Sequence, residues 1–192
     1  MTLPHLGIDP GKSSGAVVHL GRDGRQVLGW AAWWSSGRRL RFESDRQQVK
    51  TVERWQDVLV LISSWRRLDH YHLTIEGLFV VPRKGASSPA SALKLGESAG
   101  ALLGLFVDGA EGEVLRPRAL EEWRPLVLGL PKRTRASDAE TYAVKRAPLL
   151  FEWKGGFPTL PKQALGAVAE AACIARWGWV QQHRQRRIVA AL

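Results

Sequence analysis

The stretch Leu6-Gly7-Ile8-Asp9-Pro10-Gly11 is apolar apart from one carboxylate and runs straight into a Pro-Gly turn. A second stretch, Leu73-Thr74-Ile75-Glu76-Gly77, has the same character and also carries a single carboxylate. Short apolar runs bounded by turn residues are typical of β-strands. Burying even a neutral polar group without a partner costs about 2–7 kcal/mol, and burying a charged carboxylate costs more. We therefore expect Asp9 and Glu76 to lie on two strands and to share a partner.

The chain is strongly basic, with 28 Lys and Arg against 18 Asp and Glu, a formal net charge of +10 and a sequence pI of about 10.5. Such a charge attracts nucleic acid or an anionic membrane surface. A membrane partner is disfavoured, because no apolar run approaches the ~20 residues needed to span a bilayer. Carboxylates at strand positions in a basic chain predict a metal site and a polyanionic substrate, which favours a metal-dependent nuclease.

A chain of 192 residues is long enough to bury the core of one domain. The start, Met-Thr-Leu-Pro-His, has neither a basic segment nor an apolar core of the kind that directs export. Cys173 is the only cysteine, so it cannot form an internal disulfide, and its apolar neighbours predict a small core residue. We expect a location in the reducing cytoplasm.

The first third of the chain predicts three strands and a helix. Turn residues separate strands at 3–9, 15–20 and about 26–34, which indicates an antiparallel meander. From about Ser44 to Leu68 the spacing becomes helical, with apolar residues at Val49, Val52, Trp55, Leu59 and Ile62.

Strands and helices alternate in the rest of the chain. Strands are expected at 72–79 and 113–116, and helices at 89–106, 119–128, 137–147 and 161–182. A meander followed by this alternation gives an α/β fold, with a mixed five-stranded sheet and helices on both faces. The pattern suits a single ribonuclease H-like domain over residues 1–182, followed by a basic tail at 183–192 that is expected to fray.

Three motifs resemble those of the RuvC-type Holliday junction resolvases. Gly7-Ile8-Asp9-Pro10-Gly11 resembles the family's opening strand, and Ile75-Glu76-Gly77-Leu78-Phe79 resembles its second catalytic stretch, in which an aromatic residue follows the glutamate by three. Ser91-Ala92-Leu93-Lys94-Leu95-Gly96, followed by Ala99-Gly100, is similar to the helix after the DNA-contacting loop. The motifs occur in the family's order over most of the chain, and a divergent resolvase of phage or mobile-element origin would fit.

The family's remaining acidic motif lies on its last helix and matches residues 167–172 here. Glu170 takes the second acidic position, one methylene longer than the usual Asp, whereas Ala167 takes the first and offers no ligand. The resemblance therefore implies a site that keeps three carboxylates out of four.

The resemblance also implies the chemistry of two Mg²⁺ ions, with Mn²⁺ able to substitute. Two ions about 3.5–4 Å apart can activate the attacking water, neutralise the transition state and stabilise the leaving oxygen of a phosphodiester. Hard divalent cations prefer oxygen ligands. Asp9 is expected to bridge both ions, with Glu76 holding one and Glu170 the other.

Plainer roles are open for each carboxylate. Asp9 could accept hydrogen bonds from the Pro10-Gly11 turn, Glu76 could pair with a core arginine, and Glu170 could be a surface residue.

The expected DNA contacts are basic or aromatic. Phe79, by resemblance, would stack on a base at an open junction centre. Arg83 and Lys84 on the following loop would contact phosphates, as would the basic run Lys132-Arg133-Thr134-Arg135 ahead of a helix.

We expect a Mg²⁺-dependent endonuclease that cleaves four-way DNA junctions as a homodimer, because symmetric cleavage needs two related active sites. The rivals are a catalytically weakened branched-DNA-binding protein, an RNA-processing nuclease of the same fold, and an actin-like or sugar-kinase ATPase. The ATPase is disfavoured because its architecture needs two such domains. The helix at 89–106 carries Gly96, Gly100 and Gly104 on one face, which suits close packing against a sheet, another helix or a second copy.

Overall fold

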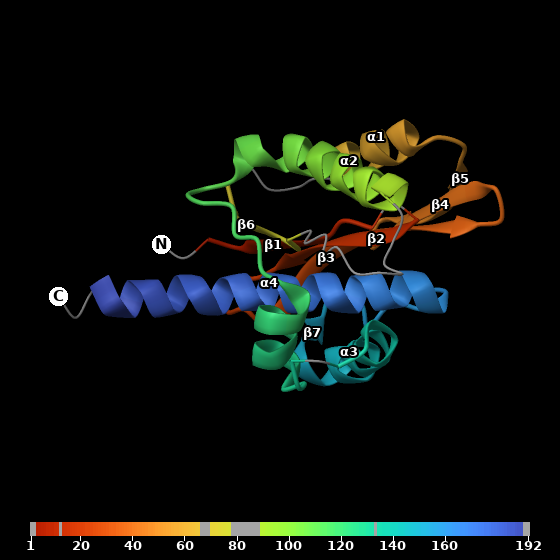
Figure 1. The fold of residues 1–192 in the computed structure, drawn as a ribbon. Coiled ribbons are helices and arrows are strands. Elements are labelled where there is room, and N and C mark those ends of the chain that lie inside the picture. The colour runs from red at the N-terminus through yellow and green to blue at the C-terminus, as the bar shows by residue number, and fades with distance from the viewer. Residues whose placement is uncertain (1–2, 12, 66–69, 78–88, 133, 190–192) are drawn as a thin grey trace.

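The computed structural model of the chain describes residues 3–11, 13–65, 70–77, 89–132 and 134–189. It is a mixed α/β structure in which helices cover both faces of one sheet (Figure 1). The strands are β1 His5–Asp9, β2 Ser14–Leu20, β3 Gln26–Ser36, β4 Arg39–Ser44, β5 Gln47–Val52, β6 His72–Ile75 and β7 Glu152–Trp153.

The strand order is β5-β4-β3-β2-β1-β6, with β7 added beside one end of β3. Strands β1 to β5 form an antiparallel meander, of which the closely spaced turns predicted only β1 to β3. The two parallel pairings are β1 with β6 and β3 with β7. The β1–β6 pairing puts the carboxyl ends of these two strands at the same edge of the sheet.

The expectation of five strands was wrong, because the described part of the sheet has seven. Residues 47–52, expected to begin a helix, form β5 and pair with β4, and the following helix begins only at Trp55. Val49 is 51% exposed on this edge strand, so its place in the apolar spacing did not reflect a buried helix face. The strand expected at 113–116 is reduced to a bridge between Leu115 and Thr74 of β6.

The helices form two layers, which Figure 1 shows above and below the sheet. One layer holds α1 (Trp55–Trp65) and α2 (Pro89–Phe106), and the other holds η2 (Ala119–Leu128), α3 (Ala136–Leu150) and α4 (Lys162–Val189). A short 3-10 turn, Val107–Gly109, follows α2. The basic tail expected to fray from residue 183 instead continues α4 as far as Val189.

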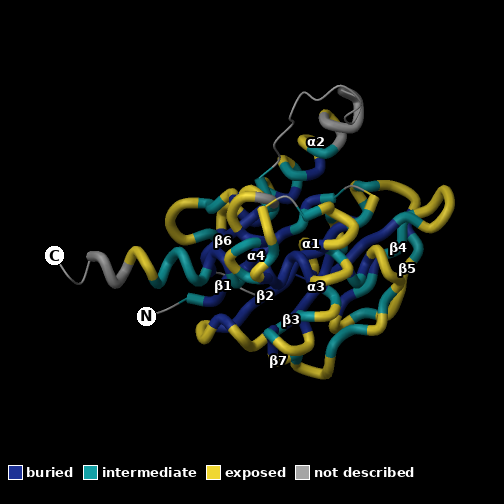
Figure 2. The backbone as a smooth tube through the Cα atoms, turned by 60° about the horizontal axis from the view of Figure 1, so that its bottom comes forward, coloured by how far each residue is buried: buried dark blue, intermediate teal, exposed yellow. Residues whose placement is uncertain are grey.

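Each face of the sheet has its own apolar core, so that the buried residues follow the strands through the middle of the molecule (Figure 2). The α4 side is built from small residues: six alanines and Cys173, all between positions 164 and 175, are fully or almost fully buried. The other side packs large residues such as Trp33, Phe42 and Tyr71 under α1 and α2. Small residues let α4 lie very close to the sheet.

Gly7 marks the closest approach of α4 to β1. A Cβ atom on this residue would collide with the Ala171 carbonyl oxygen and would lie 2.5 Å from the Ala175 amide nitrogen. Both obstacles are backbone atoms, which cannot rotate away. The glycine therefore fixes the depth at which α4 packs.

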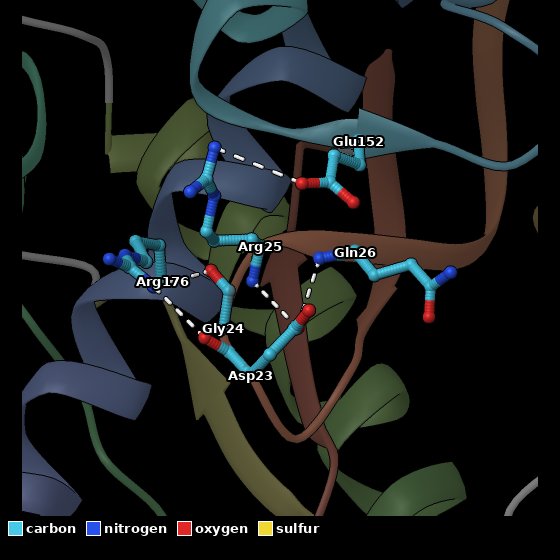
Figure 3. Close-up of polar contacts among 6 residues, drawn as sticks. All are labelled: Asp23, Gly24, Arg25, Gln26, Glu152 and Arg176. Carbon is cyan, nitrogen blue, oxygen red and sulfur yellow. Dashed lines mark hydrogen bonds and ion pairs between the residues drawn. The ribbon is translucent and has the colours of Figure 1, made fainter.

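The turn between β2 and β3 fixes α4 at a second point (Figure 3). The Asp23 side chain accepts hydrogen bonds from the Arg25 and Gln26 amides at 2.9 and 3.0 Å, which closes the turn. Arg176 on α4 then donates to the Gly24 carbonyl at 2.7 Å. Gly24 has φ +68°, a conformation that a residue with a side chain rarely adopts.

The glycines of α2 do not pack closely against the sheet or another described helix, although their spacing suggested that they would. Among the described residues, no atom lies within 4 Å of a Cβ built on Gly96, Gly100 or Gly104. Gly96 and Gly100 instead line a cleft beside Glu76.

Candidate active site

Asp9 and Glu76 lie side by side where two parallel strands end. Asp9 is the last residue of β1, and Glu76 follows directly after β6. Ile8 is paired with Ile75, and the Glu76 amide donates to the Ile8 carbonyl at 3.0 Å. The register therefore brings together two carboxylates that are 67 positions apart in the sequence.

Both carboxylates belong to the face of the sheet that α4 covers. Side chains alternate between the two faces along a strand, so Asp9 lies on the face of Gly7, against which Ala171 and Ala175 pack. By the same alternation Glu76 lies on the face of Thr74, whose hydroxyl would collide with a Cβ on Gly178 of α4. Two neighbouring strands thus present their carboxylates to one helix.

Glu170 joins them from α4, one residue before Ala171. Its side chain is only 11% exposed, so the alternative that Glu170 is a surface residue is wrong. The three carboxylates influence one another: burial raises the pKa of Asp9 most, and the charges of Glu76 and Glu170 raise that pKa further. Burial likewise raises the pKa of Glu76, and burial together with Glu76 raises the pKa of Glu170 to about 7.

Two adjacent residues of η2 contact two of these acids. Trp123 Nε1 donates to Glu76 Oε1 at 3.2 Å, and Arg124 donates to Glu170 Oε1 at 2.8 Å in a buried ion pair. The guanidinium also lies 5.1 Å from the centre of the Trp123 ring. Neither residue was predicted from sequence, because nothing in the Trp-Arg-Pro stretch points to partners 47 residues earlier and 46 residues later in the chain.

Asp9 and Glu76 also interact with groups other than the acids. A backbone hydrogen bond from Gly11 lowers the pKa of Asp9, which agrees with the alternative that Asp9 accepts hydrogen bonds from the Pro10-Gly11 turn. Arg124 and Trp123 both lower the pKa of Glu76, although burial outweighs them. These contacts orient the carboxylates, but they compensate the burial of three acids only in part, because all three pKa values remain raised.

Glu140 of α3 is a fourth carboxylate near the site. A Cβ on Gly166 would collide with its Oε1 atom, so the glycine makes room for this side chain against α4. Its charge adds a small upward effect on the pKa of Glu170. Ala167, at the position where the resemblance expects an acid, is buried and offers no donor.

We predict that, in EDTA, the free energy of unfolding falls as pH rises from about 5 to about 8. The Glu170 carboxyl has an ordinary pKa of 4.5 and a folded-state pKa of about 7. Between these values the folded protein holds a proton that the unfolded chain has released, so raising the pH favours unfolding, by on the order of 3 kcal/mol or less for this group. Urea denaturation at both pH values measures the difference.

Glu170→Gln is the control for this pH effect, and it should reduce the slope because one titrating group is gone. Asp9 and Glu76, whose pKa values are also raised, should keep the rest of it. Asp23 and Asp57 do not interfere: their pKa values are lowered, so the stability they contribute is lost only at more acidic pH. A wild-type protein that becomes more stable between about pH 5 and about pH 8 would contradict the prediction.

The donor chemistry at Asp9 and Glu76 fits a hard divalent cation, since both are oxygen donors and their shared negative charge is costly without one. Glu170 is different, because its Oε1 atom already binds Arg124. Within the described ranges, no group of three or more His, Cys, Asp or Glu side chains is arranged to hold one ion. The structure therefore fits a cation at the strand ends better than one at Glu170.

A cleft of about 460 Å³ opens beside Glu76. It runs between the end of β6 and α2, and Arg116 supplies a basic side chain to its lining. The exposed glycines of α2 form part of its wall, which lets a bulky ligand approach the helix backbone.

The expected DNA contacts are only partly located. Phe79, Arg83, Lys84 and Arg133 lie outside the described residues. Lys132 and Arg135 are exposed on the connection between η2 and α3, where Arg135 is the residue that precedes α3.

Neither the protein-family models nor the curated proteins gave a match to this sequence. Among solved structures, the chain is similar to the RuvC structure of Thermus thermophilus, with 14% sequence identity and a TM-score of 0.43 over 93% of this chain and 95% of that chain. In the part of the chain that is described, every helix is too short or too polar to cross a bilayer.

Proposed function

We propose that the protein is a divalent-metal-dependent DNA endonuclease with a ribonuclease H-like fold, and that it resolves four-way junctions as RuvC-type enzymes do. The observation that carries the proposal is the meeting of Asp9, Glu76 and Glu170 on one face of the sheet, from three segments far apart in the sequence. Burial raises the pKa of all three acids, and the charges of Glu76 and Glu170 raise that of Asp9 further. Such perturbed acids are costly to bury and are concentrated at functional sites.

Asp9 and Glu76 would hold Mg²⁺, or Mn²⁺ in its place, at the adjacent strand ends. When bound there, the cation would activate a water molecule and neutralise charge on the phosphate. Trp123 holds Glu76 in position through its indole hydrogen bond, and Arg124 keeps a positive charge beside Glu170. The buried apolar layer under α4 keeps these groups out of bulk solvent, which strengthens every charge interaction between them.

Nucleic acid would reach the site through the cleft that Arg116 lines. Arg116, Lys132 and Arg135 would contact phosphates, and the net charge of +10 would draw the polyanion toward the protein. Phe79, Arg83, Lys84 and Arg133 are proposed to add contacts, with Phe79 stacking on a base. We propose a cytoplasmic homodimer, in which two copies cut related strands of one junction.

A cleavage assay on synthetic substrates tests the proposal. A four-way DNA junction, a linear duplex and a single-stranded RNA are incubated with Mg²⁺, with Mn²⁺ or with EDTA. We expect cleavage of the junction in either metal and none in EDTA. Preference for RNA would point to an RNA-processing nuclease, and the absence of cleavage on all three substrates would refute the proposal.

A second candidate is a branched-DNA-binding protein with little or no nuclease activity. The buried Arg124–Glu170 pair favours it, because a carboxylate bound to a guanidinium has less capacity for a metal ion. Tight binding of the junction without metal-dependent cutting would identify this alternative.

A further inference from the structure

Arg124 is held inside the acidic site by two partners. Its guanidinium donates to Glu170 Oε1 at 2.8 Å and lies 5.1 Å from the centre of the Trp123 ring. The side chains of Arg124 and Glu170 are 9% and 11% exposed, so the pair is shielded from solvent. A buried ion pair is retained only where its geometry is good, because both charges lose their hydration.

The positive charge of Arg124 acts on all three carboxylates. It lowers the pKa of Asp9, of Glu76 and of Glu170, and among the described residues no other basic side chain lowers any of these three pKa values. When all three carboxylates are ionised, as they would be around a bound cation, they and the one guanidinium leave two negative charges at the site. One divalent cation would balance this charge, whereas two would leave the buried site strongly positive. Glu140 changes the balance less, because it is partly exposed and solvent screens its charge.

The available ligands also indicate that the site holds one cation. Asp9 and Glu76 adjoin each other across β1 and β6, and either could take a cation. Glu170 has one oxygen committed to Arg124, and Ala167 offers no donor. Of the ligands expected for a second ion on α4, only the other oxygen of Glu170 is therefore left.

Arg124 also has an unused donor. Its Nε atom is buried and has no hydrogen-bond partner among the described residues. Buried donors without a partner are uncommon in folded proteins and call for an explanation. An arginine offers paired N–H groups whose geometry matches two oxygens of a phosphate.

We propose that Arg124 takes the place of the second metal ion, so that the site binds one divalent cation per chain and uses the guanidinium to neutralise the bound phosphate. The proposal rests on the nuclease function above and concerns how that function is carried out. It assigns Asp9 and Glu76 to the cation and Glu170 to the positioning of Arg124. Glu170 is then not a metal ligand, in contrast to the expectation from sequence.

The number of Mn²⁺ ions bound per chain tests the proposal without any measurement of cleavage. Titration of the full chain, followed by electron paramagnetic resonance of the free ion, should give one Mn²⁺ for wild type and for Glu170→Gln. Asp9→Asn should weaken binding by about 100-fold or more, because it removes a ligand. Glu170→Gln should change the affinity by less than about 10-fold, because Glu170 acts only through its charge.

Variants of Arg124 give an independent readout. Arg124→Met leaves Glu170 free and removes a positive charge, so we expect a second Mn²⁺ to bind, whereas Arg124→Lys should retain one. Arg38→Met, on an exposed turn, is the matched control and should leave the number at one. If Arg124→Met does not fold, the double variant Arg124→Met/Glu170→Gln removes the unpaired buried charge, and it should bind one ion.

The possible failures can be told apart. Two ions bound to wild type, or equal losses of affinity in Glu170→Gln and Asp9→Asn, would overturn the role of Arg124 and leave the proposed nuclease intact. No binding of Mn²⁺ to wild type would overturn the nuclease proposal itself, and this inference with it.

Discussion

Replacing Asp9 with asparagine is expected to lower the rate of metal-dependent junction cleavage by about 10³-fold or more. Asp9 ends β1 beside Glu76, and the charges of both other acids raise its pKa. Asparagine keeps the size of the side chain and can still accept the hydrogen bond from Gly11. The loss should therefore come from the missing charge and not from misfolding.

Single-turnover cleavage of a labelled four-way junction in Mg²⁺ measures this effect. Asp108→Asn, at an exposed acid in the 3-10 turn after α2, is the matched control and should cleave at the wild-type rate. In EDTA, Asp9→Asn should also be at least as stable as wild type, because it removes a charge from a group of buried acids. Cleavage by Asp9→Asn within 10-fold of wild type would exclude the assignment of this site.

Replacing Gly7 with alanine is expected to destabilise the protein by about 3 kcal/mol or more. The added methyl group would collide with the Ala171 carbonyl and crowd the Ala175 amide, so α4 would have to move away from β1. Ordinary overpacking costs about 1–3 kcal/mol, and side-chain neighbours can often relax. Backbone atoms in the middle of a helix cannot, and displacement of α4 would also move Glu170 away from Asp9.

Urea denaturation compares Gly7→Ala with Gly100→Ala, which adds the same methyl group to α2. Gly100 is exposed and has open space around it, so alanine there should be neutral or should stabilise by up to about 1 kcal/mol through helix propensity. A Gly7→Ala protein as stable as Gly100→Ala would show that α4 does not pack at the depth described.

The sequence predicted those parts of the fold in which local pattern and tertiary structure agree. The meander β1 to β3 follows from turn residues at 10–14 and 21–24, and the helix predicted at 89–106 has the same bounds as α2. The prediction of a helix around Val49 was wrong, because an exposed edge strand can carry the same spacing of apolar residues as a helix. Pairing partners, not spacing, decide between the two.

The candidate site was only partly predictable for the same reason. Asp9 and Glu76 stand out because each is a lone carboxylate in an apolar run, and the parallel pairing of β1 with β6 brings them together. Arg124 has no such signal, since its importance depends on the position of Glu170 in the folded chain. The glycines of α2 show the reverse case, a pattern that suggested close packing but lies along an open cleft.

The single cysteine lies at the interface between α4 and the sheet. Cys173 is fully buried, three residues beyond Glu170, and burial raises the pKa of its thiol far above the ordinary value. A thiol in this state reacts with alkylating reagents only when the surrounding structure opens. The rate of its alkylation therefore reports how often the helix that carries Glu170 separates from the strands, and the natural chain needs no engineered label for that measurement.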